Sequence, residues 1–445
     1  MTLSRGRRRV VAAAISAIAV VPSLTGCGGA SGSGGDSKTL TYWSMWTKGE
    51  PQAKVLRQTA AAFQKSTGIH VDIKWVGRNV LTNVSANLNG GTLPDLVDQD
   101  AGELKATFGT ANAATGLQDL CGQQIIGESK KLCSVLPTAV MERYQTADGQ
   151  PMMIPYELIS SALWFNGKQL PSVASNPPTT WSEFTSLLDK EKAAGRSPLA
   201  LDGDTGQYTS YWWTHAGVRH AGPGALRDAV ADKSGKSWDK PEFLAAAQDI
   251  EKLTKGGYFT SDYTGTKWPA QQSAWADGGS KSDFLLMGSW APSETAPFAA
   301  KNPVKFQYRS MPYPNVDGGE GNGSVEESLI GFAIPSKAEQ PQNAEKFIRF
   351  FLNKKYVSGI STTALNLTSR QDVAVPPQLA DLKKQVAAAG TNTFQSDDGV
   401  TADYPQFGSE SYYPTVQKFL DGRLDAEGFI AALKKATIEY WKNQG

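Results

Sequence analysis

Apolar residues along the chain alternate between strand-like and helix-like spacing. Residues 40–46 form a short β-prone run, and from Pro51 apolar positions recur at helical spacing until Gly68. Residues 69–75 then alternate apolar and polar positions, which predicts a half-buried strand. A strand, a helix and a strand in succession predict a βαβ unit, and therefore a parallel sheet covered by helices.

The same alternation recurs further along the chain. Further strands are predicted at 151–155, 162–166, 198–201, 284–287 and 328–334. Further helices are predicted from the capping box Thr180-Trp181-Ser182-Glu183, over 344–351, and from Asp425 onward. We therefore expect an α/β fold, and because 445 residues are too many for one open sheet, we expect two lobes. The glycine-rich run 318–323 predicts a flexible loop.

Composition and charge exclude several classes of protein. The chain has 44 Lys and Arg against 43 Asp and Glu, so it lacks the basic excess typical of nucleic-acid binding. His70, His215 and His220 are isolated, no G-x-S-x-G motif is present, and His70 lies at an exposed phase of its strand. We therefore expect no enzyme activity, no metal and no cofactor.

The first 37 residues have the pattern of an export and anchoring segment. Arginines at 5–9 precede the apolar run 10–21, which is too short to span a bilayer and predicts a signal peptide over 1–26. Leu24-Thr25-Gly26-Cys27 resembles a bacterial lipobox, in which cleavage leaves Cys27 as a lipidated N-terminus. Residues 28–37 are rich in Gly and Ser, so 27–37 is expected to be a lipidated Cys and a flexible tether. The prediction is a protein anchored by lipid at the extracytoplasmic face of the bacterial cell membrane, exported by the Sec or the twin-arginine route.

Two further cysteines lie 12 positions apart, at Cys121 and Cys133. An exported protein can form a disulfide between them, which would close a short loop and contribute about 3 kcal/mol at most. The alternative is two free buried thiols. No neighbouring Cys or His has zinc-like spacing, so a metal site is not expected there.

Six stretches match a known pattern in order. They are LTYW (40–43) leading to FQKSTGIHV (63–71), GTLPDLV (91–97), IPY (154–156) through LWFN (163–166), PTTW (178–181), MGSW (287–290), and GFAI (331–334) with the helix 344–351. Together they resemble the extracytoplasmic solute-binding proteins of ABC importers, specifically the carbohydrate-binding family that includes maltose-binding protein.

The resemblance implies two lobes of open sheet flanked by helices, joined by about three hinge strands, in the periplasmic-binding-protein manner. We expect lobe 1 at 38–155 and 298–350, and lobe 2 at 156–297 and 351–445. The implied function is capture of a sugar in the cleft between the lobes and delivery to the permease subunits of an ABC importer. A di- or oligosaccharide is favoured because the chain has 12 Trp, and a monomer is expected.

Aromatic candidates follow from sugar chemistry, because the C–H face of a sugar stacks on aromatic rings. The tryptophans considered are Trp43, Trp46, Trp164, Trp212, Trp213, Trp268, Trp275 and Trp290. Trp290 is favoured by the resemblance, Trp46 follows the first strand, and one of the adjacent pair Trp212 and Trp213 is expected to face the cleft. Tyr412 and Tyr413 lie where the family often supplies another ring.

Polar candidates pair with sugar hydroxyls. They are Thr47, Lys48 and Glu50 near the first strand, Asp98, Gln99, Asp100 and Glu103 after the third, Glu157 at the expected hinge, and Glu326 at the return crossing. Each could instead be a solvated loop residue. Asp95 is expected to be structural, and Thr47 departs from the acid found there in the maltose-binding pattern.

Two other functions are compatible with parts of the sequence. A secreted glycoside hydrolase needs two carboxyl groups about 5–10 Å apart, but no acid here lies in a motif of such enzymes. A ferric-iron-binding protein could use Tyr412 and Tyr413, yet iron also requires convergent carboxylates, and the tryptophan content favours a sugar.

Overall fold

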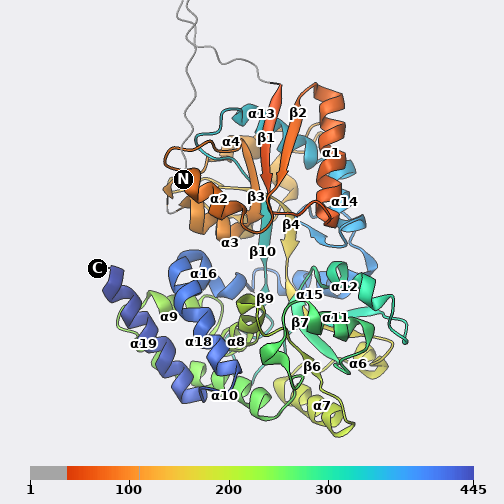
Figure 1. Cartoon of the computed structure of the whole chain (residues 1–445), viewed down its shortest axis with the longest axis vertical. Helices are drawn as coiled ribbons and strands as arrows, with labels where there is room; N and C mark the ends of the chain where they lie inside the picture. Colours follow the sequence, from red (N-terminus) through yellow and green to blue (C-terminus); the bar gives the residue numbers. More distant parts are fainter. Residues whose placement is uncertain (1–37, 110, 445) are drawn as a thin grey trace, which may run out of the picture. The chain divides into compact units, whose positions relative to one another are not determined.

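The computed structural model describes residues 38–109 and 111–444, which lie in a single compact unit (Figure 1). The predicted signal peptide, Cys27 and tether lie outside the described residues. No helix in the described part of the chain is both long and apolar enough to cross a bilayer. The fold is α/β, as predicted, with one sheet of six strands and another of four.

The six-stranded sheet has the order β11-β4-β10-β3-β1-β2. Its strands are β1 (Thr39–Ser44), β2 (His70–Trp75), β3 (Leu96–Asp100), β4 (Ile154–Ile159), β10 (Ser328–Ala333) and β11 (Leu367–Thr368). The first strand pairs in parallel with β2 and β3, which confirms the predicted βαβ unit, while β10 is antiparallel to both β3 and β4. In Figure 1 this sheet occupies the upper half of the molecule.

The four-stranded sheet has the order β6-β7-β5-β8. Its strands are β5 (Ser161–Asn166), β6 (Leu199–Ala200), β7 (Phe284–Gly288) and β8 (Tyr308–Met311). A separate parallel pair joins β9 (Val325–Glu326) to β12 (Thr393–Phe394). Every residue of β5 and β7 is buried, because helices cover both faces of this sheet.

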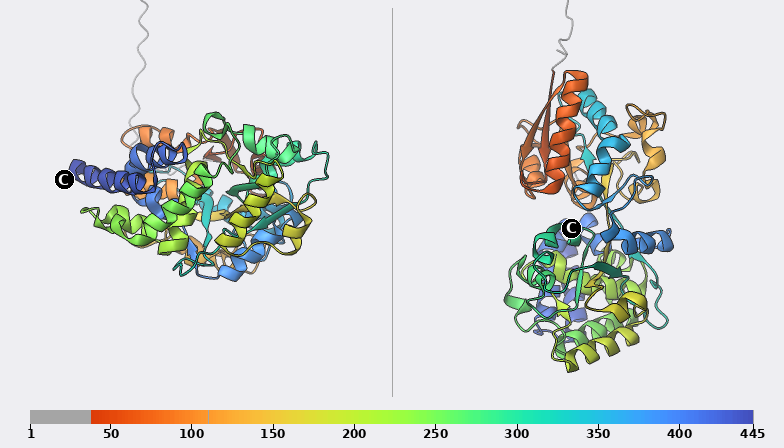
Figure 2. Two further views of the ribbon diagram at one scale, coloured as in Figure 1. Left: turned by 90° about the horizontal axis from the view of Figure 1, so that it is seen from below. Right: turned by 90° about the vertical axis from the view of Figure 1, so that its right-hand side faces the viewer.

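Helices surround both sheets. The longer ones are α1 (Pro51–Thr67), α2 (Val80–Asn87), α7 (Trp181–Ala193), α8 (Gly206–Ala221), α9 (Ala225–Ala231), α10 (Pro241–Lys255), α11 (Ala270–Asp277), α12 (Ala291–Ala299), α13 (Pro341–Phe351), α14 (Lys354–Thr362), α15 (Ala380–Ala389), α18 (Tyr413–Leu420) and α19 (Ala426–Gln444). Short helical turns are α3 (Ala101–Leu104), α4 (Gln118–Gly122), α5 (Thr138–Met141), α6 (Pro171–Ser175), α16 (Val400–Asp403) and α17 (Pro405–Phe407). Figure 2 shows α1, α13 and α14 packed together beside the six-stranded sheet.

Several local features predicted from the sequence are present in the structure. Gly68 ends α1 in a left-handed conformation with φ 75°, and the Thr180 capping box at the start of α7 is formed from both sides. The apolar stripe of α13 is fully buried through Phe347 and Phe351. His70 is exposed, as its strand phase predicts.

The chain passes between the two sheets at three places. Only Ser160 separates β4 from β5, Glu327 separates β9 from β10, and residues 369–379 lead from β11 to α15, which packs on β8. The strand pairing corrects the expected boundaries twice. Residues 308–311, expected in lobe 1, belong to the four-stranded sheet, whereas residues 354–368, expected in lobe 2, pack on α1 and β4. The division into two lobes itself stays a prediction.

Two loops can be compared with their predictions. Cys121 and Cys133 form a disulfide, with sulfur atoms 2.01 Å apart.

The glycine-rich run 318–323 is held in place by packing against neighbouring backbone. A Cβ added at Gly321 would lie 1.8 Å from the carbonyl oxygen of Val218, so this backbone touches the end of α8. The Arg219 guanidinium also donates to the Gly321 carbonyl at 2.9 Å, which corrects the expectation of a flexible loop.

Candidate functional site

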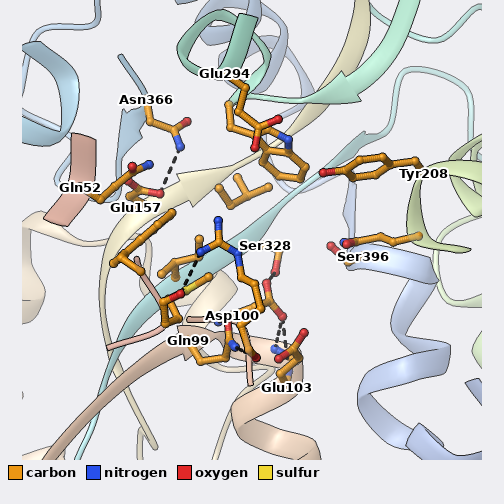
Figure 3. Close-up of a pocket in the computed structure, with 18 of the residues that line it drawn as sticks. Gln52, Gln99, Asp100, Glu103, Glu157, Tyr208, Glu294, Ser328, Asn366 and Ser396 are labelled. Carbon is orange, nitrogen blue, oxygen red and sulfur yellow. Dashed lines mark hydrogen bonds between the residues drawn. The ribbon is translucent and has the colours of Figure 1, made fainter. Parts of the chain in front are cut away.

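A pocket of about 820 Å³ opens between elements of the two sheets (Figure 3). On the side of the six-stranded sheet, its lining comes from the turn after β1, from α3 and from β4 and β10. On the side of the four-stranded sheet, it comes from α8, residues 268–272, α12 and residues 395–413. Such a pocket can contact one ligand from both sides at once.

Trp46 lines the pocket and is held by a chain of buried hydrogen bonds. Its indole nitrogen donates to the Tyr156 hydroxyl at 2.7 Å, and that hydroxyl donates to the Asp98 carboxylate at 2.6 Å. Asp98 also accepts from the Met45 backbone nitrogen at 2.8 Å and from Ser44 at 3.3 Å. Burial raises the pKa of the Asp98 carboxyl above its ordinary value, although these donors oppose the rise. Asp98 therefore fixes the turn that presents Trp46.

Arg78 is the only Lys or Arg among the described residues that line the pocket. Its guanidinium lies 4.9 Å from the centre of the Trp46 ring, in cation–π geometry. It also makes two contacts with the Glu50 carboxylate, at 2.6 and 3.2 Å, and donates to the Met45 carbonyl at 2.8 Å. Its positive charge is therefore balanced by Glu50.

Asp100 and Glu103 lie where β3 meets α3. Asp100 caps α3 by accepting from the backbone nitrogens of Gly102 and Glu103 at 2.8 and 3.3 Å, and it accepts from Ser328 at 2.9 Å. Burial, and the nearby charge of Asp100, raise the pKa of Glu103 to about 7. Glu103 is thus poised between its charged and neutral forms at neutral pH.

Glu157 is a fully buried carboxyl on β4 that faces the pocket. One of its oxygens accepts from the Asn366 side chain at 3.1 Å, and the other has no hydrogen-bond partner among the described residues. Burial raises its pKa to about 8, although Gln52 and Asn366 oppose the rise. Figure 3 shows Glu157 between these two amide side chains.

Aromatic side chains line the opposite side. Trp290 starts α12, and its ring covers the end of β7. A Cβ at Gly288 would lie 2.2 Å from that ring, so only glycine permits this packing. The indole nitrogen of Trp290 is buried without a hydrogen-bond partner among the described residues. The centres of the Tyr208 and Trp290 rings lie 6.4 Å apart. Trp268 is 46% exposed, which is unusual for so large an apolar side chain.

Tyr413 and Asp397 complete this side of the pocket. The Tyr413 hydroxyl donates to the Asp397 carboxylate at 2.5 Å, and Ser210 donates to the same carboxylate at 2.6 Å. Burial raises the pKa of Asp397, and its neutral donors oppose the rise. Asp397 also adopts φ 50°, a left-handed conformation that is uncommon outside glycine but better tolerated by Asp than by most residues.

The structure brings together eight of the fifteen residues favoured by the sequence. Those lining the pocket are Trp46, Glu50, Gln99, Asp100, Glu103, Glu157, Trp290 and Tyr413. Trp268, considered only as one of the tryptophans, lines it too. Their placement in one pocket is a fact of the fold, while their contacts with a ligand remain predictions.

The other predicted residues do not line the pocket. Thr47 and Lys48 lie on an exposed turn, and Asp98 lies beneath the lining. Glu326 is buried in β9, where it accepts from Ser396 at 2.5 Å. Tyr412 is buried against Thr214, with their oxygens 2.9 Å apart.

Trp212 and Trp213 were expected to place one ring in the cleft, but both are fully buried. They lie on α8, which is buried around its whole circumference from Thr209 to Arg219. Trp212 packs edge-on against Phe259 at 5.4 Å, and Trp213 packs edge-on against Phe429 at 4.8 Å. A helix enclosed on every side can bury two adjacent rings.

Other lining residues were not found from the sequence. They include Arg78, Gln52, Tyr208, Gln272, Glu294, Ser328, Asn366, Ser396 and Asp397. Most lie in loops or near the ends of elements, without a shared motif. The weak signal available was position alone, because Ser328 begins a predicted strand, whereas the strand that follows Asn366 was not predicted.

The carboxyl groups of the pocket are spread around its wall. Figure 3 shows Glu157, Glu294 and Glu103 on different sides. Within the described part of the chain, no group of three or more His, Cys, Asp or Glu could hold a metal ion. The arrangement suits hydrogen bonding to several parts of one larger ligand.

Two sheets joined by three crossings, with a pocket lined from both, define the architecture of a solute-binding protein. The chain matches the family model of bacterial extracellular solute-binding proteins over residues 48–358, and it belongs to this family. The family resemblance seen in the sequence is thereby confirmed.

Relatives and solved structures agree with this assignment. A "Probable sugar-binding periplasmic protein" of Mesorhizobium japonicum is 26% identical over 298 residues, covering 64% of this chain and 67% of that protein. A protein with the same description from Brucella suis is 26% identical over 229 residues, covering 48% of this chain and 52% of its own. The chain thus spans only half to two thirds of these relatives. A solved "Chitin oligosaccharide binding protein" superposes with a TM-score of 0.75 at 22% identity, over 91% of this chain and 99% of that one, which shows a shared fold.

Proposed function

We propose that this protein binds a saccharide in the pocket and delivers it unchanged to the membrane permease of an ABC importer. The observation that carries the proposal is the composition of the pocket wall. The aromatic rings of Trp46, Trp268 and Trp290 line the pocket together with carboxyl and amide side chains, including Glu157 and Asn366. Rings suit the C–H faces of a sugar, and carboxyl and amide groups suit its hydroxyls.

The relatives support the same ligand class, since several carry the words "sugar-binding" in their descriptions. A volume of about 820 Å³ suits two or more sugar rings, which favours a di- or oligosaccharide. The protein is expected to act as a monomer and without chemistry on its ligand.

Binding would work by population shift. A ligand that contacts Trp46 on one side and Trp290 on the other gains its full contact only when the two sides approach. The short crossing at Ser160 is where such a rotation would be concentrated. The permease would then recognise the ligand-bound form.

The test is calorimetric titration of the protein from residue 38 onward with mono- and oligosaccharides of several linkages. We expect submicromolar binding of at least one oligosaccharide, with a change in tryptophan emission. Trp290→Ala should weaken it about 30-fold or more, because loss of a central aromatic contact costs about 2 kcal/mol or more. Trp43→Ala is the matched control, since Trp43 lies outside the pocket against Lys74 at 5.3 Å.

Failure of every saccharide to bind would overturn the proposal. Recovery of a shortened glycan by mass spectrometry after incubation would point instead to the hydrolase alternative. The recovered sugar should have its original mass.

Anchoring is a separate part of the proposal and has its own test. Lipid on Cys27 should place the full-length protein in the membrane fraction of a bacterial host. Cys27→Ser should release it into the soluble extracytoplasmic fraction. Equal release of both forms would contradict the anchor and leave sugar binding untouched.

A further inference from the structure

The pocket wall carries a large excess of acid. Six carboxyl side chains line it, namely Glu50, Asp100, Glu103, Glu157, Glu294 and Asp397. Among the described lining residues, Arg78 is the only permanently charged cation. Since Arg78 is already paired with Glu50 at 2.6 Å, it leaves five carboxyl groups without a cationic partner in close contact.

Four of those five carboxyl groups accept hydrogen bonds from neutral donors, and the more distant charge of Arg78 acts on Glu103, Glu157 and Glu294. Asp100 accepts from backbone nitrogens and Ser328, Asp397 accepts from hydroxyls, and Glu294 accepts from Gln272 at 3.0 Å. Glu157 accepts from Asn366 at 3.1 Å, and the neutral Gln52 amide also lowers its pKa. Neutral hydrogen bonds satisfy lone pairs but supply no positive charge to a partly enclosed space.

One oxygen of Glu157 gives independent evidence of a missing partner. The side chain is fully buried, it lines the pocket, and this oxygen has no hydrogen-bond donor among the described residues. A buried carboxyl oxygen without a donor is costly in a folded protein, so a bound ligand is the natural source of that donor.

The spacing of the acids restricts what the ligand can be. The acids are distributed over the pocket wall (Figure 3). Among the described residues, no three of them lie close enough together to hold a metal ion. Burial raises the pKa values of Glu103 to about 7 and of Glu157 to about 8, so both retain protons readily when no cation is near. An ammonium group would supply three N–H donors together with the missing charge.

We propose that the pocket selects saccharides that carry a free ammonium group, that is, amino sugars without an N-acetyl group, over neutral saccharides of the same length. The inference rests on the proposed function and narrows its ligand class. Saccharides with carboxylate groups should be rejected, because they add negative charge to an acidic wall.

The first experiment compares matched oligosaccharides by calorimetry. The probes are β-1,4-linked dimers to tetramers of glucosamine, of N-acetylglucosamine and of glucose, with oligogalacturonate as the anionic probe. At least one glucosamine oligomer should bind tenfold or more tighter than its neutral counterparts. Its affinity should also fall with added salt, as expected for partly exposed charges.

Each outcome separates the two proposals. If a neutral oligomer binds as tightly as the glucosamine oligomer or tighter, ammonium selection is overturned while sugar binding stands. If oligogalacturonate binds best, ammonium selection is likewise overturned. If no probe binds and no other sugar does, both proposals fail.

Charge-removing variants test whether these carboxyl groups are the cause. Glu103→Gln and Glu157→Gln should each weaken glucosamine-oligomer binding tenfold or more, and leave binding of the neutral oligomers within a factor of three. Glu439→Gln is the matched control, because Glu439 lies exposed on α19 in a pair with Lys435. The Glu103 side chain is solvent-accessible although it lines the pocket wall, so its variant should fold normally. An unchanged preference in both pocket variants would overturn the proposal.

Discussion

The Tyr156 hydroxyl bridges Trp46 and Asp98, because it accepts from the indole at 2.7 Å and donates to the carboxylate at 2.6 Å. Tyr156→Phe would remove both bonds. The buried Trp46 indole nitrogen would lose its partner, and the Asp98 carboxylate would keep its donors from Met45 and Ser44 but have one donor fewer. We expect a loss of about 1–3 kcal/mol in the free energy of unfolding, together with weaker ligand binding. Urea denaturation and calorimetry measure the two effects.

Tyr313→Phe is the control for this substitution. The Tyr313 hydroxyl is buried without a hydrogen-bond partner among the described residues, so its removal should be neutral or stabilising. Equal losses from both variants would contradict the role assigned to Tyr156.

Gly288→Ala should disturb the pocket without touching a ligand. The added Cβ would lie 2.2 Å from the Trp290 ring, which must therefore move. Overpacking of this kind costs about 1–3 kcal/mol, and the displaced ring should weaken ligand binding at least tenfold. Gly265→Ala adds a methyl group with no atom within 4 Å, and it should leave both quantities unchanged. Normal ligand affinity in Gly288→Ala would show that the position of Trp290 is unimportant.

The buried Glu157 predicts a pH dependence of stability. Its pKa is about 8 in the folded protein against an ordinary 4.5, so the native state keeps this proton while the unfolded chain loses it. The free energy of unfolding should therefore fall as the pH rises from about 4.5 to 8, relative to Glu157→Gln. The variant should match the natural protein near pH 4 and exceed it by a few kcal/mol at pH 8. Parallel stability curves in urea across this range would contradict the prediction.

Gly321→Ala tests the packed glycine run. Its Cβ would meet the Val218 carbonyl oxygen at 1.8 Å, so the backbone must shift away from α8 and from Arg219. We expect a loss of about 2–3 kcal/mol in the free energy of unfolding. Gly122→Ala, with no atom within 4 Å, should change it little. A flexible loop would tolerate both substitutions equally.

Periodicity and capping signals were sufficient to predict much of the fold. The stripe through Phe347 and Phe351, and the Thr180 capping box, depend on neighbours close in sequence, and both are present. The prediction that Trp212 or Trp213 faces the cleft was wrong. Both lie on α8, and a helix that is buried on all sides has no polar face from which the inward side can be predicted.

The pocket was harder to predict because its residues come from many separate segments. Trp46 and Trp290 follow strands, and strand ends are where such folds bind ligands. Arg78 and Glu294 approach these rings only through the folding of distant segments. The lobe boundaries failed at β8 for the same reason, since the partner of Tyr308–Met311 is β5, far back in the sequence.

The order of strands in the six-stranded sheet also affects how the chain can fold during synthesis. Its inner strand β10 lies between β3 and β4, yet its residues 328–333 emerge from the ribosome long after those neighbours. Until then β3 and β4 lack the strand that joins them, so the N-terminal segments cannot complete their sheet. The six-stranded sheet therefore cannot be completed before residues 328–333 have been synthesised, which makes its centre a late product of translation.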